Sequence, residues 1–500
     1  MLSIIDSRPF PALPSSLNLA EEVLAAGQAT PDKPALEILH PDRAGVWSYA
    51  RLTATIRGCG TALTDQGLHP GDRVLIRLGN TAAFPILYLG AIAAGLVPVA
   101  TSAALTAAEV THMATLTTPR LIIADPGLAL PAHPAPVIPP DLALWQSLPP
   151  CPFHQGDPNR EGYIVFTSGT SRHPLAVSHA HRAILARRAM HQGWEGLTRD
   201  DRLLHAGAFN WTYTLGTGLL DPWTLGATAL VPAAGTPDTA LVSLLHRANA
   251  TIFAAVPGIY RQILRHTLPP LPHLRHGLSA GESLAAPTRA AWRTATGCDI
   301  HEALGMSEIS TYLSGAPSRP APEGSCGYVQ QGRHAALLDA TGTPVPRGTS
   351  GTLALSTDDP GLMRGYIGHP APAGDWFLTG DIASMAPDGA LTSLGRMDDL
   401  INPGGFRIAP QEVEAAFLSF PGLVTCAVTE LEPTPGTRIL ACFYESPTPL
   451  DPASLAAHAS ANLARWKQPR VYHHLDKLPR AANGKLIRRA LANLAPKEGP

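Results

Sequence analysis

Charged side chains are scarce in this chain, and the charges present nearly cancel. Only 15% of the 500 residues are Asp, Glu, Lys or Arg, and the formal net charge is −2. Proteins that bind nucleic acid or anionic membranes by charge carry a basic surplus, so the whole-chain balance gives no support for either partner. Pro and Gly also stay below the range of disordered proteins, and an apolar fraction of 45% suffices for buried cores.

Cysteine is rare and long apolar runs are missing. None of the six cysteines forms a C-x-x-C pair or has zinc-ligand spacing with His, which excludes the common zinc motifs. Asp6 and three prolines interrupt the N-terminal region where a secretory signal needs an unbroken apolar core. The longest apolar stretch, 82–94, contains Pro85 and is too short to cross a bilayer. Scattered free thiols fit a reducing compartment, so we expect a cytoplasmic protein without a membrane span.

The pattern of strands and helices predicts more than one domain, as the length also does. Strand-like runs alternate with helical stretches over 73–125 and 201–256, which predicts βαβ units and largely parallel sheets. Residues 17–67 have helical Ala/Leu stripes, and 302–308 has the composition of a turn. Short apolar runs after Pro317 predict a small β-subdomain. We therefore expect an α/β protein: a large N-terminal lobe of two mixed or parallel α/β subdomains plus a small β-subdomain, followed by a small α+β C-terminal domain ending in a basic helix.

Residues 163–181, YIVFTSGTSRHPLAVSHAH, contain the stretch around which the chain is organised. A strand-like run is followed at once by small hydroxyl residues around one glycine. Such a loop offers backbone N–H groups and four hydroxyls to a single anion, as a phosphate-binding loop does. It is not the G-x-x-x-x-G-K-[ST] pattern, and a plain Ser/Thr-rich surface turn is the alternative. The candidate phosphate contacts are Thr167, Ser168, Gly169, Thr170 and Ser171.

Four further residues suit nucleotide chemistry, although each also has an ordinary structural explanation. Asp381 offers a carboxylate to a ribose diol, and the guanidinium of Arg396 is able to bridge ribose and phosphate oxygens. Glu308, after a Gly-x-Ser turn, offers a hard oxygen to Mg²⁺. Lys485 lies in a Gly-flanked loop and would neutralise charge on phosphate oxygens. The alternatives are a turn aspartate, a surface arginine, a solvated glutamate and an exposed lysine.

The separated motifs together resemble those of the acyl-adenylate-forming enzymes, a family of acyl-CoA synthetases, peptide-synthetase adenylation domains and beetle luciferases. The resemblance extends from about Leu17 to Leu494, and the motifs follow the family's order. The matching segments are 167–171 (TSGTS) with Pro174 and Val177, 279–283 (SAGES), 304–308 (LGMSE), 379–381 (TGD), 395–399 (GRMDD), 404–408 (GGFRI) and 479–485 (PRAANGK).

The resemblance implies a role for each matching position. Asp381 and Arg396 are the implied ribose contacts, Ser307 contacts the α-phosphate, and Glu308 is the implied Mg²⁺ ligand. Lys485 reaches the carboxylate and the α-phosphate during adenylation. The other implied ATP or AMP contacts are 167–171, Gly281, Glu282, Ser283, Leu304 and Gly305. The implied hinge residue is Asp398, the implied CoA contacts are Gly404 and Gly405, and the implied acyl-pocket residues are Phe209, Asn210 and Trp211, which otherwise form a plain core segment.

The implied activity is that of an ATP-dependent acid–thiol ligase with ATP, Mg²⁺ and coenzyme A. Residues 209–228 look most like those of benzoate-type and other small-acid CoA ligases. The implied division is an adenylation domain at 1–396, a hinge at 397–402 and a mobile C-terminal domain at 403–500. Two alternatives stay open: a stand-alone enzyme that loads an acyl carrier protein, and a nucleotide- or acyl-binding relative without turnover. No nucleic-acid partner is implied, and a homodimer stays open.

The phosphate loop departs from the family's pattern at two main positions. Leu175 stands where a lysine that helps hold pyrophosphate is usual, Arg172 stands where a glycine is usual, and Ala176 is a milder change. Since a guanidinium binds phosphate bidentately, we expect Arg172 to supply the missing charge as a catalytic residue. The alternative is impaired ATP chemistry. Arg172→Ala should therefore weaken adenylation more than Arg182→Ala, and equal rates would contradict this role.

Overall fold

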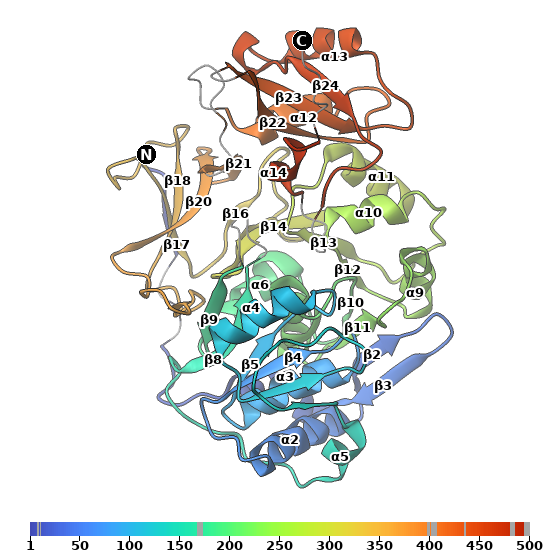
Figure 1. Ribbon diagram of the computed structural model, residues 1–500, viewed down its shortest axis with the longest axis vertical. Coiled ribbons are helices and arrows are strands. Elements are labelled where there is room, and N and C mark those ends of the chain that lie inside the picture. The colour runs from blue at the N-terminus through green and yellow to red at the C-terminus, as the bar shows by residue number, and fades with distance from the viewer. Residues whose placement is uncertain are drawn as a thin grey trace.

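The computed structural model describes residues 1–7, 10, 12–167, 174–397, 401, 408–434, 437–480 and 486–494. Two large mixed sheets form the body of the protein, a five-stranded sheet lies beside them, and a C-terminal lobe lies above (Figure 1). The α/β architecture expected from the alternating pattern is confirmed. Among the described residues, no helix combines the length and the apolar character that crossing a membrane requires.

The first sheet has seven strands in the order β19-β9-β8-β5-β4-β6-β7. β4 pairs in parallel with β5 and β6 because the intervening helices α3 and α4 return the chain to the same edge. α3 is buried all round, as a helix with apolar residues on every face must be. The bounds are β4 Arg73–Arg77, α3 Ala83–Ala93, β5 Val97–Ala100, α4 Ala107–Thr117, β6 Leu121–Ala124, β7 Val137–Ile138, β8 Glu161–Phe166, β9 Ala176–Ala180 and β19 Gly365–Tyr366.

The second sheet has nine strands in the order β16-β15-β14-β13-β12-β10-β11-β2-β3. Its central strands are parallel and buried, whereas the pairings β14–β15, β15–β16 and β2–β3 are antiparallel, with β16 and β3 at the two edges. The bounds are β2 Pro34–Leu39, β3 Ala44–Ser48, β10 Arg202–His205, β11 Thr228–Pro232, α9 Leu241–Arg247, β12 Ile252–Ala254, α10 Pro257–Ile263, β13 His276–Ala280, α11 Ala286–Thr296, β14 Ile300–Met306, β15 Ser310–Ser314 and β16 Tyr328–Val329.

Further helices cover these two sheets. α6 follows β9 directly and continues into one turn of π-helix, and a second π-helical turn lies between α7 and α8. The bounds are α1 Leu19–Leu24, α2 Tyr49–Asp65, α5 Leu142–Ser147, α6 Ala183–Met190, α7 Thr212–Leu215 and α8 Asp221–Leu225, with π-turns at His191–Glu195 and Gly216–Leu220.

The small β-subdomain is a five-stranded antiparallel sheet in the order β1-β17-β18-β20-β21. Residues from opposite ends of the large lobe meet in it, because β1 from the N-terminus pairs with β17. The bounds are β1 Ile4–Asp6, β17 His334–Leu338, β18 Ser350–Ser356, β20 Trp376–Met385 and β21 Leu391–Arg396.

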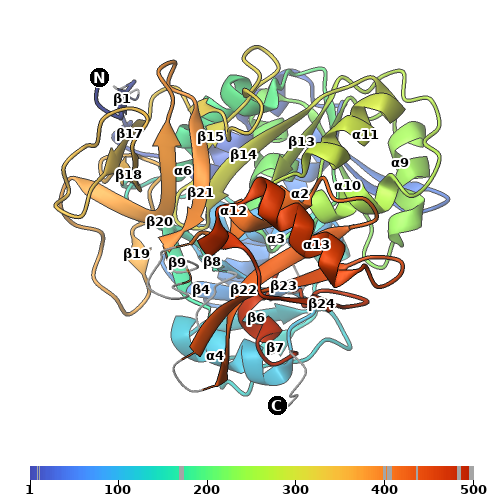
Figure 2. The ribbon, with the colours of Figure 1, turned by 90° about the horizontal axis from the view of Figure 1, so that it is seen from above.

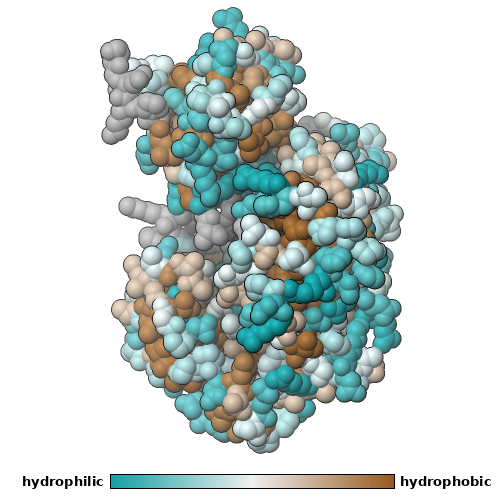
Figure 3. All heavy atoms as spheres, turned by 90° about the vertical axis from the view of Figure 1, so that its right-hand side faces the viewer, coloured by the Kyte–Doolittle hydropathy of each residue, from teal (hydrophilic) through white to brown (hydrophobic). Residues whose placement is uncertain are grey.

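The C-terminal lobe has its own core, in which Val413 and Phe417 of α12 pack against Val428 and Cys442 of the sheet. Figure 3 shows this lobe as a narrower mass above the larger body. The bounds are α12 Pro410–Phe417, β22 Thr425–Thr434, β23 Thr437–Glu445, α13 Pro452–Asn462, β24 Val471–His474 and α14 Arg488–Leu491. The predicted hinge at 397–402 falls largely on residues outside those described, so the domain boundaries stay a prediction.

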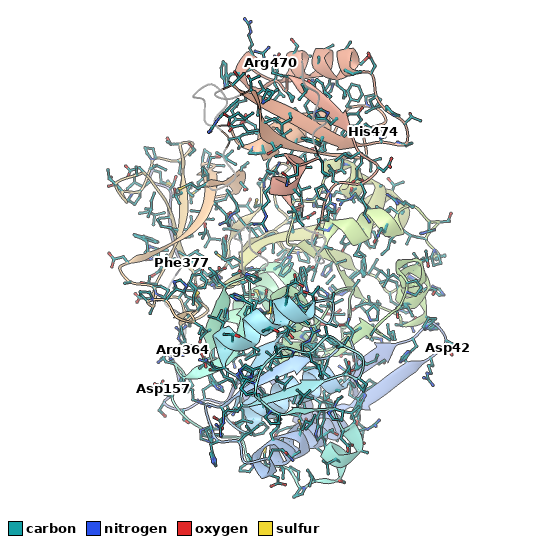
Figure 4. All side chains as sticks on the ribbon, in the orientation of Figure 1. Asp42, Asp157, Arg364, Phe377, Arg470 and His474 are labelled. Atoms are coloured by element: carbon teal, nitrogen blue, oxygen red, sulfur yellow. The ribbon has the colours of Figure 1, made fainter. Side chains whose placement is uncertain are left out.

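Three local predictions were wrong or only partly right. Residues 34–48, expected within a helical region, form the β2–β3 hairpin, whose tip at Asp42 projects from the body (Figure 4). Parallel pairing with β11, a contact of large sequence separation, stabilises β2 as a strand, and β3 pairs in turn with β2. Residues 302–306 are strand rather than turn, since β14 pairs on both sides. The final helix is short, with only Arg488–Leu491 helical.

Candidate nucleotide and acyl site

The phosphate-loop candidate lies between β8 and β9 in the chain. Thr167 closes the hairpin by donating its N–H to the Leu175 carbonyl and accepting the Leu175 N–H on Oγ1, both at 3.0 Å. Leu175 is therefore held by its backbone at the base of the loop, and its side chain is half-buried. Ser168, Gly169, Thr170, Ser171 and Arg172 lie outside the described residues, so their phosphate roles stay predictions.

The turn that carries Glu308 joins β14 to β15. Gly305 lies just before it, at a break in the strand register. A Cβ on Gly305 would come within 2.4 Å of the Ser310 carbonyl oxygen and 2.7 Å of the Thr311 Cα, so only glycine lets the two strands approach this closely. Leu304 is half-buried against the core cluster of the five-stranded sheet. The glycine of this motif thus shapes the hairpin whose turn presents Ser307 and Glu308.

Two hydrogen bonds tie this turn to the first sheet. His179 Nε2 on β9 lies 2.7 Å from the Ser307 carbonyl oxygen. Tyr366 Oη on β19 donates to Glu308 Oε1 at 2.7 Å, and β19 itself pairs with β9. Arg364, labelled in Figure 4, extends the same junction by donating its N–H to the Ser178 carbonyl at 2.7 Å. The hairpin carrying the phosphate loop and the turn carrying Glu308 therefore lie against each other.

Asp381 and Arg396 face each other across β20 and β21. They are direct partners in the strand register, and Arg396 Nη1 donates to Asp381 Oδ1 at 3.4 Å. Tyr312 of β15 donates its hydroxyl to Asp381 Oδ2 at 2.9 Å. Burial, and next the charge of Asp381, raise the pKa of Tyr312 well above its ordinary value, so this hydroxyl stays a donor. Through Tyr312, the predicted ribose pair is joined to the hairpin that carries Glu308.

The loop after β13 carries the remaining predicted nucleotide contacts, Gly281, Glu282 and Ser283. Gly281 has φ +95°, which a glycine adopts without strain, and β13 lies in parallel register with β14. Glu282 forms an ion pair with Arg480 of the C-terminal lobe, with Nη1 at 3.2 Å from Oε1 and 3.3 Å from Oε2. Ser283 is exposed. Arg480 begins the isolated antiparallel bridge to Leu486 that flanks the segment containing Lys485.

The lining of the pocket includes none of the three predicted acyl-pocket residues. Phe209 is only 1% exposed and stacks on Phe84 with ring centroids 5.4 Å apart. Asn210 and Trp211 are half-buried. The pocket lining itself begins one residue later, at Thr212, and continues through Leu215, Gly216 and Leu220 to Ser307 and Ile309 of the Glu308 turn. The role of Phe209, Asn210 and Trp211 stays a prediction.

Several predicted site residues lie outside the described residues, namely Asp398, Gly404, Gly405 and Lys485 as well as the tip of the phosphate loop. Arg182, the intended comparison for Arg172, bonds Asn159 Oδ1 and the carbonyls of Pro360 and Leu362. Its removal would therefore unsettle the fold. Arg120, whose side chain is 68% exposed, is a better control for Arg172→Ala.

The donor set around Glu308 fits Mg²⁺. Within the described ranges, no three His, Cys, Asp or Glu side chains gather as a metal cluster. Mg²⁺ bound with ATP takes one or two carboxylates and fills its other positions with phosphate and water oxygens, so a single buried carboxylate such as Glu308 suffices. The Tyr366 hydroxyl fixes the direction of that carboxylate.

Sequence patterns do not identify the partners found in this region, which are Tyr312, Tyr366, His179 and Arg480. Their contacts join positions 69, 58, 128 and 198 residues apart, and hydrogen bonds of this kind have no periodicity to detect. The P-R dipeptide at Pro479-Arg480 was part of a matching motif, but the motif alone does not identify Glu282 as the partner of its arginine.

Two family models match the chain. One described as AMP-binding enzyme matches residues 23–367, and one described as AMP-binding enzyme C-terminal domain matches 412–485. The chain is 28% identical to the 3-hydroxybenzoate–CoA ligase of Aromatoleum sp. (strain CIB), with 96% of this chain and 97% of that protein covered. It is 27% identical to the benzoate–CoA ligase of Thauera aromatica, with 97% and 98% covered.

Solved structures agree over nearly the whole chain. The anthranilate CoA ligase AuaEII in complex with anthranoyl-AMP superimposes with a TM-score of 0.87 at 25% identity, covering 97% of this chain and 98% of that one. A benzoate CoA ligase from Burkholderia xenovorans LB400 superimposes with a TM-score of 0.86 at 25% identity, covering 95% and 100%.

Proposed function

Since the chain belongs to the AMP-binding enzyme family, we propose that it activates a small carboxylic acid, of benzoate type, as an acyl adenylate and transfers the acyl group to coenzyme A. The observation that carries the proposal is the continuous set of contacts from Arg396 through Asp381 and Tyr312 to the Glu308 turn. Side chains that are distant in sequence but suited to ribose, Mg²⁺ and phosphate lie along one junction.

The first half-reaction joins the acid to AMP. A carboxylate oxygen of the acid attacks the α-phosphorus of ATP, the bond to the bridging oxygen breaks, and pyrophosphate leaves with its electron pair. Asp381 accepts hydrogen bonds from the ribose hydroxyls, and Arg396 beside it limits the motion of the sugar. Glu308 would hold Mg²⁺, and the ion would offset the negative charge of the phosphates. Ser307 orients the α-phosphate, and Lys485 neutralises charge on the bridging oxygens.

The second half-reaction joins the acyl group to the thiol. The sulfur of coenzyme A attacks the acyl carbonyl carbon, and AMP leaves with the oxygen that joined it to the acyl group. We propose that the C-terminal lobe turns about Asp398 between the two steps, bringing Gly404 and Gly405 to the thiol donor. A glycine backbone there allows the pantetheine chain to lie close.

The acid class is proposed from the relatives. Two relatives act, by their names, on benzoate or 3-hydroxybenzoate, and one solved neighbour holds anthranoyl-AMP. The pocket beside Ser307 has a mixed lining, with aliphatic residues such as Leu215, Leu220 and Ile309 beside aromatic and polar ones. A carrier-protein acceptor, a homodimer and a cytoplasmic location stay predictions.

Pyrophosphate release tests the proposal. The protein is incubated with Mg-ATP and a panel of aromatic and aliphatic acids, with and without coenzyme A, and the acyl-CoA ester is measured in parallel. We expect pyrophosphate with at least one acid and a CoA ester only when CoA is present. Pyrophosphate without an ester points to carrier-protein loading. No pyrophosphate with any acid refutes the ligase and supports a binding protein that lost turnover with the lysine replaced by Leu175.

A further inference from the structure

A buried arginine–aspartate pair holds the start of β15, directly after the turn that presents Ser307 and Glu308. Arg187 of α6 donates Nε to Asp221 Oδ1 at 2.8 Å and Nη2 to Asp221 Oδ2. The arginine side chain is 8% exposed and the carboxylate is fully buried. The remaining nitrogen, Nη1, donates to Ser310 Oγ at 2.6 Å. The guanidinium therefore bridges a buried carboxylate and the second residue after Glu308.

A second buried pair holds the next residue of β15. Arg333 Nη1 donates to Asp359 Oδ2 at 2.6 Å, and both side chains are only 1% exposed. Arg333 Nη2 donates to the carbonyl oxygen of Thr311 at 2.8 Å. Four residues after Asp359, the N–H of Met363 donates to the carbonyl oxygen of Glu308, also at 2.8 Å. This pair therefore lies between β15 and a segment that is hydrogen bonded to the Glu308 backbone.

The backbone of Ser310 is strained. Its φ of +67° lies in the left-handed region, which a residue with a Cβ adopts only at a cost. Two other described non-glycine residues with positive φ, Thr118 and Asn249, follow the helices α4 and α9, where this conformation is common. Ser310 instead opens a strand. Such a conformation persists only where the surroundings hold it, and it is concentrated at functional sites.

Burying these charges does not serve stability well. Removing two charges from water offsets much of their attraction, so apolar side chains of similar size would often stabilise a core as well. What a buried pair provides is direction, because an arginine fixed by two bonds to a carboxylate has its remaining nitrogen fixed too. Gly216 leaves room for this arrangement, since a Cβ there would lie 2.1 Å from Arg187 Nη2.

The first pair keeps its charges at neutral pH. Burial acts to raise the pKa of Asp221, but the charge of Arg187 and hydrogen bonds from His191 and Arg187 lower it below the ordinary value. The carboxylate is therefore ionised when the nucleotide is present, and the arginine remains bound to it.

We infer that these two pairs, which we call the turn clamps, position the Glu308 turn for the Mg²⁺ and phosphates of ATP. The inference rests on the proposed function and adds four positioning residues to it, namely Arg187, Asp221, Arg333 and Asp359. None of them is proposed to bind ATP. They act by holding residues 310 and 311, so that the turn is already ordered when Mg-ATP binds and the ordering does not reduce the affinity.

Paired substitutions test each clamp without leaving a lone buried charge. Arg187→Met combined with Asp221→Asn removes the first clamp, and Arg333→Met combined with Asp359→Asn removes the second. Ser310→Ala removes only the hydroxyl that the first clamp holds, so it decides the outcome if a double variant does not fold.

The control removes an ion pair from another part of the large lobe. Arg202 of β10 donates Nη2 to Glu37 Oε1 of β2 at 2.9 Å, and both side chains are partly buried. Arg202→Met combined with Glu37→Gln should lower the Tm of the unliganded protein. It should leave the effect of Mg²⁺ on ATP binding as in the wild type.

Thermal unfolding measures binding independently of turnover. The rise in Tm is titrated with ATP in the presence of Mg²⁺ and, separately, with ATP and EDTA, which gives an apparent Kd for each. We expect the Kd for Mg-ATP to rise about tenfold in each clamp variant, as when a side chain that supports a metal ligand is removed. The Kd for ATP in EDTA should change little. Ser310→Ala should act in the same direction, and the KM for Mg-ATP in the pyrophosphate assay should rise in parallel.

The outcomes separate this inference from the proposed function. If the clamp variants and Ser310→Ala bind Mg-ATP as well as the control does, the inference is overturned, while pyrophosphate release by the wild type would still support the ligase. If no acid gives pyrophosphate but the clamp variants selectively lose Mg-dependent binding, the ligase is refuted and the inference stands. A wild type that binds ATP equally with Mg²⁺ and with EDTA overturns the inference together with the Mg²⁺ role of Glu308.

Discussion

At the scale of single residues, Asp381, which we propose binds the ribose, is held in place by two neighbouring side chains. It already accepts hydrogen bonds from Arg396 on one oxygen and from Tyr312 on the other, which fixes its orientation before any nucleotide binds. It is 8% exposed, so a ligand that bonds to it does so in a largely desolvated place. Such charge-assisted bonds are stronger than neutral ones.

Asp381→Asn should therefore weaken ATP binding selectively. A hydrogen bond to a charged group contributes about 1.5–3 kcal/mol, so the KM for ATP should rise on the order of 10–100-fold. The KM for the acid should change little. The control is Asp388→Asn, which alters an exposed carboxylate in the turn between β20 and β21. Equal KM values for ATP in the two variants would contradict the ribose role of Asp381.

Four histidines buried in the large lobe make stability depend on pH. Burial lowers the pKa of His179 and His301 to about 4 and that of His181 and His205 to about 3. The unfolded chain binds a proton at each near pH 6.5, whereas the folded protein does not. Their contribution to stability is therefore complete above pH 6.5 and is lost as the pH falls toward 4, by about 1.4 kcal/mol per pH unit for each histidine.

Urea unfolding at pH 7 and pH 5 measures this loss. The midpoint should fall at pH 5, and His205→Leu should make the fall smaller because one proton fewer is taken up on unfolding. His69→Leu changes an exposed histidine and should leave the fall unchanged. Glu195 has the opposite effect on the pH dependence of stability. Burial raises the pKa of its carboxyl well above the ordinary value, so its contribution to stability grows as the pH falls. A midpoint that rises from pH 7 to pH 5 would contradict the prediction.

At the scale of elements, the β14–β15 hairpin belongs both to the core sheet and to the candidate site. It lies in the nine-stranded sheet, presents Glu308 at its turn, and positions Tyr312 under Asp381. The close approach at Gly305 sets its shape. A change of one methyl group at this glycine should therefore act on both stability and adenylation.

Gly305→Ala should lower the Tm and slow pyrophosphate release. The added Cβ overlaps the backbone of Ser310 and Thr311, and overpacking of this kind costs about 1–3 kcal/mol. Gly258→Ala in α10 is the matched control, because the nearest atom to its Cβ is the flexible end of Arg261 at 3.8 Å. That helical substitution should be neutral or stabilising by about 0.4–1 kcal/mol. Thermal unfolding and the pyrophosphate assay together check both variants, and a fully active, equally stable Gly305→Ala would contradict the role of this contact.

At the scale of the whole molecule, the question is how the C-terminal lobe is held over the body. Viewed from above, β22 to β24 lie over the middle of the protein, between the β20–β21 edge and the α10–α11 side (Figure 2). The Arg480–Glu282 ion pair connects the lobe to the loop after β13. Since Arg480 lies shortly before Lys485 in the chain, we expect the loss of this pair to affect adenylation first.

Arg480→Gln should slow adenylation and spare thioester formation. A partly exposed ion pair contributes about 0.2–1 kcal/mol, so adenylation should fall by up to about fivefold. The rate of CoA ester formation from pre-formed acyl-AMP should stay the same or rise, because the lobe is released for the second step. Lys467→Gln is the control, since it removes an ion pair with Glu412 inside the C-terminal lobe. A charge exchange, Glu282→Arg with Arg480→Glu, should recover part of the adenylation rate, and equal losses in both half-reactions would contradict the prediction.

The sequence by itself determined the alternation of strands and helices, the two large α/β portions, the β-subdomain and the C-terminal α+β lobe. It also determined the residue types suited to ribose, Mg²⁺ and phosphate, because apolar periodicity and short motifs are local properties of a chain. Asp381 and Arg396 were predicted as a pair, and they are direct partners between β20 and β21.

The tertiary structure alone decided which distant side chains meet. The strand conformation of β2 depends on pairing with β11. The partners Tyr312, Tyr366 and Arg480 reach their carboxylates from positions far along the chain. Such contacts depend on the positions of whole elements in space, and these are set by the summed burial of the cores rather than by any local pattern.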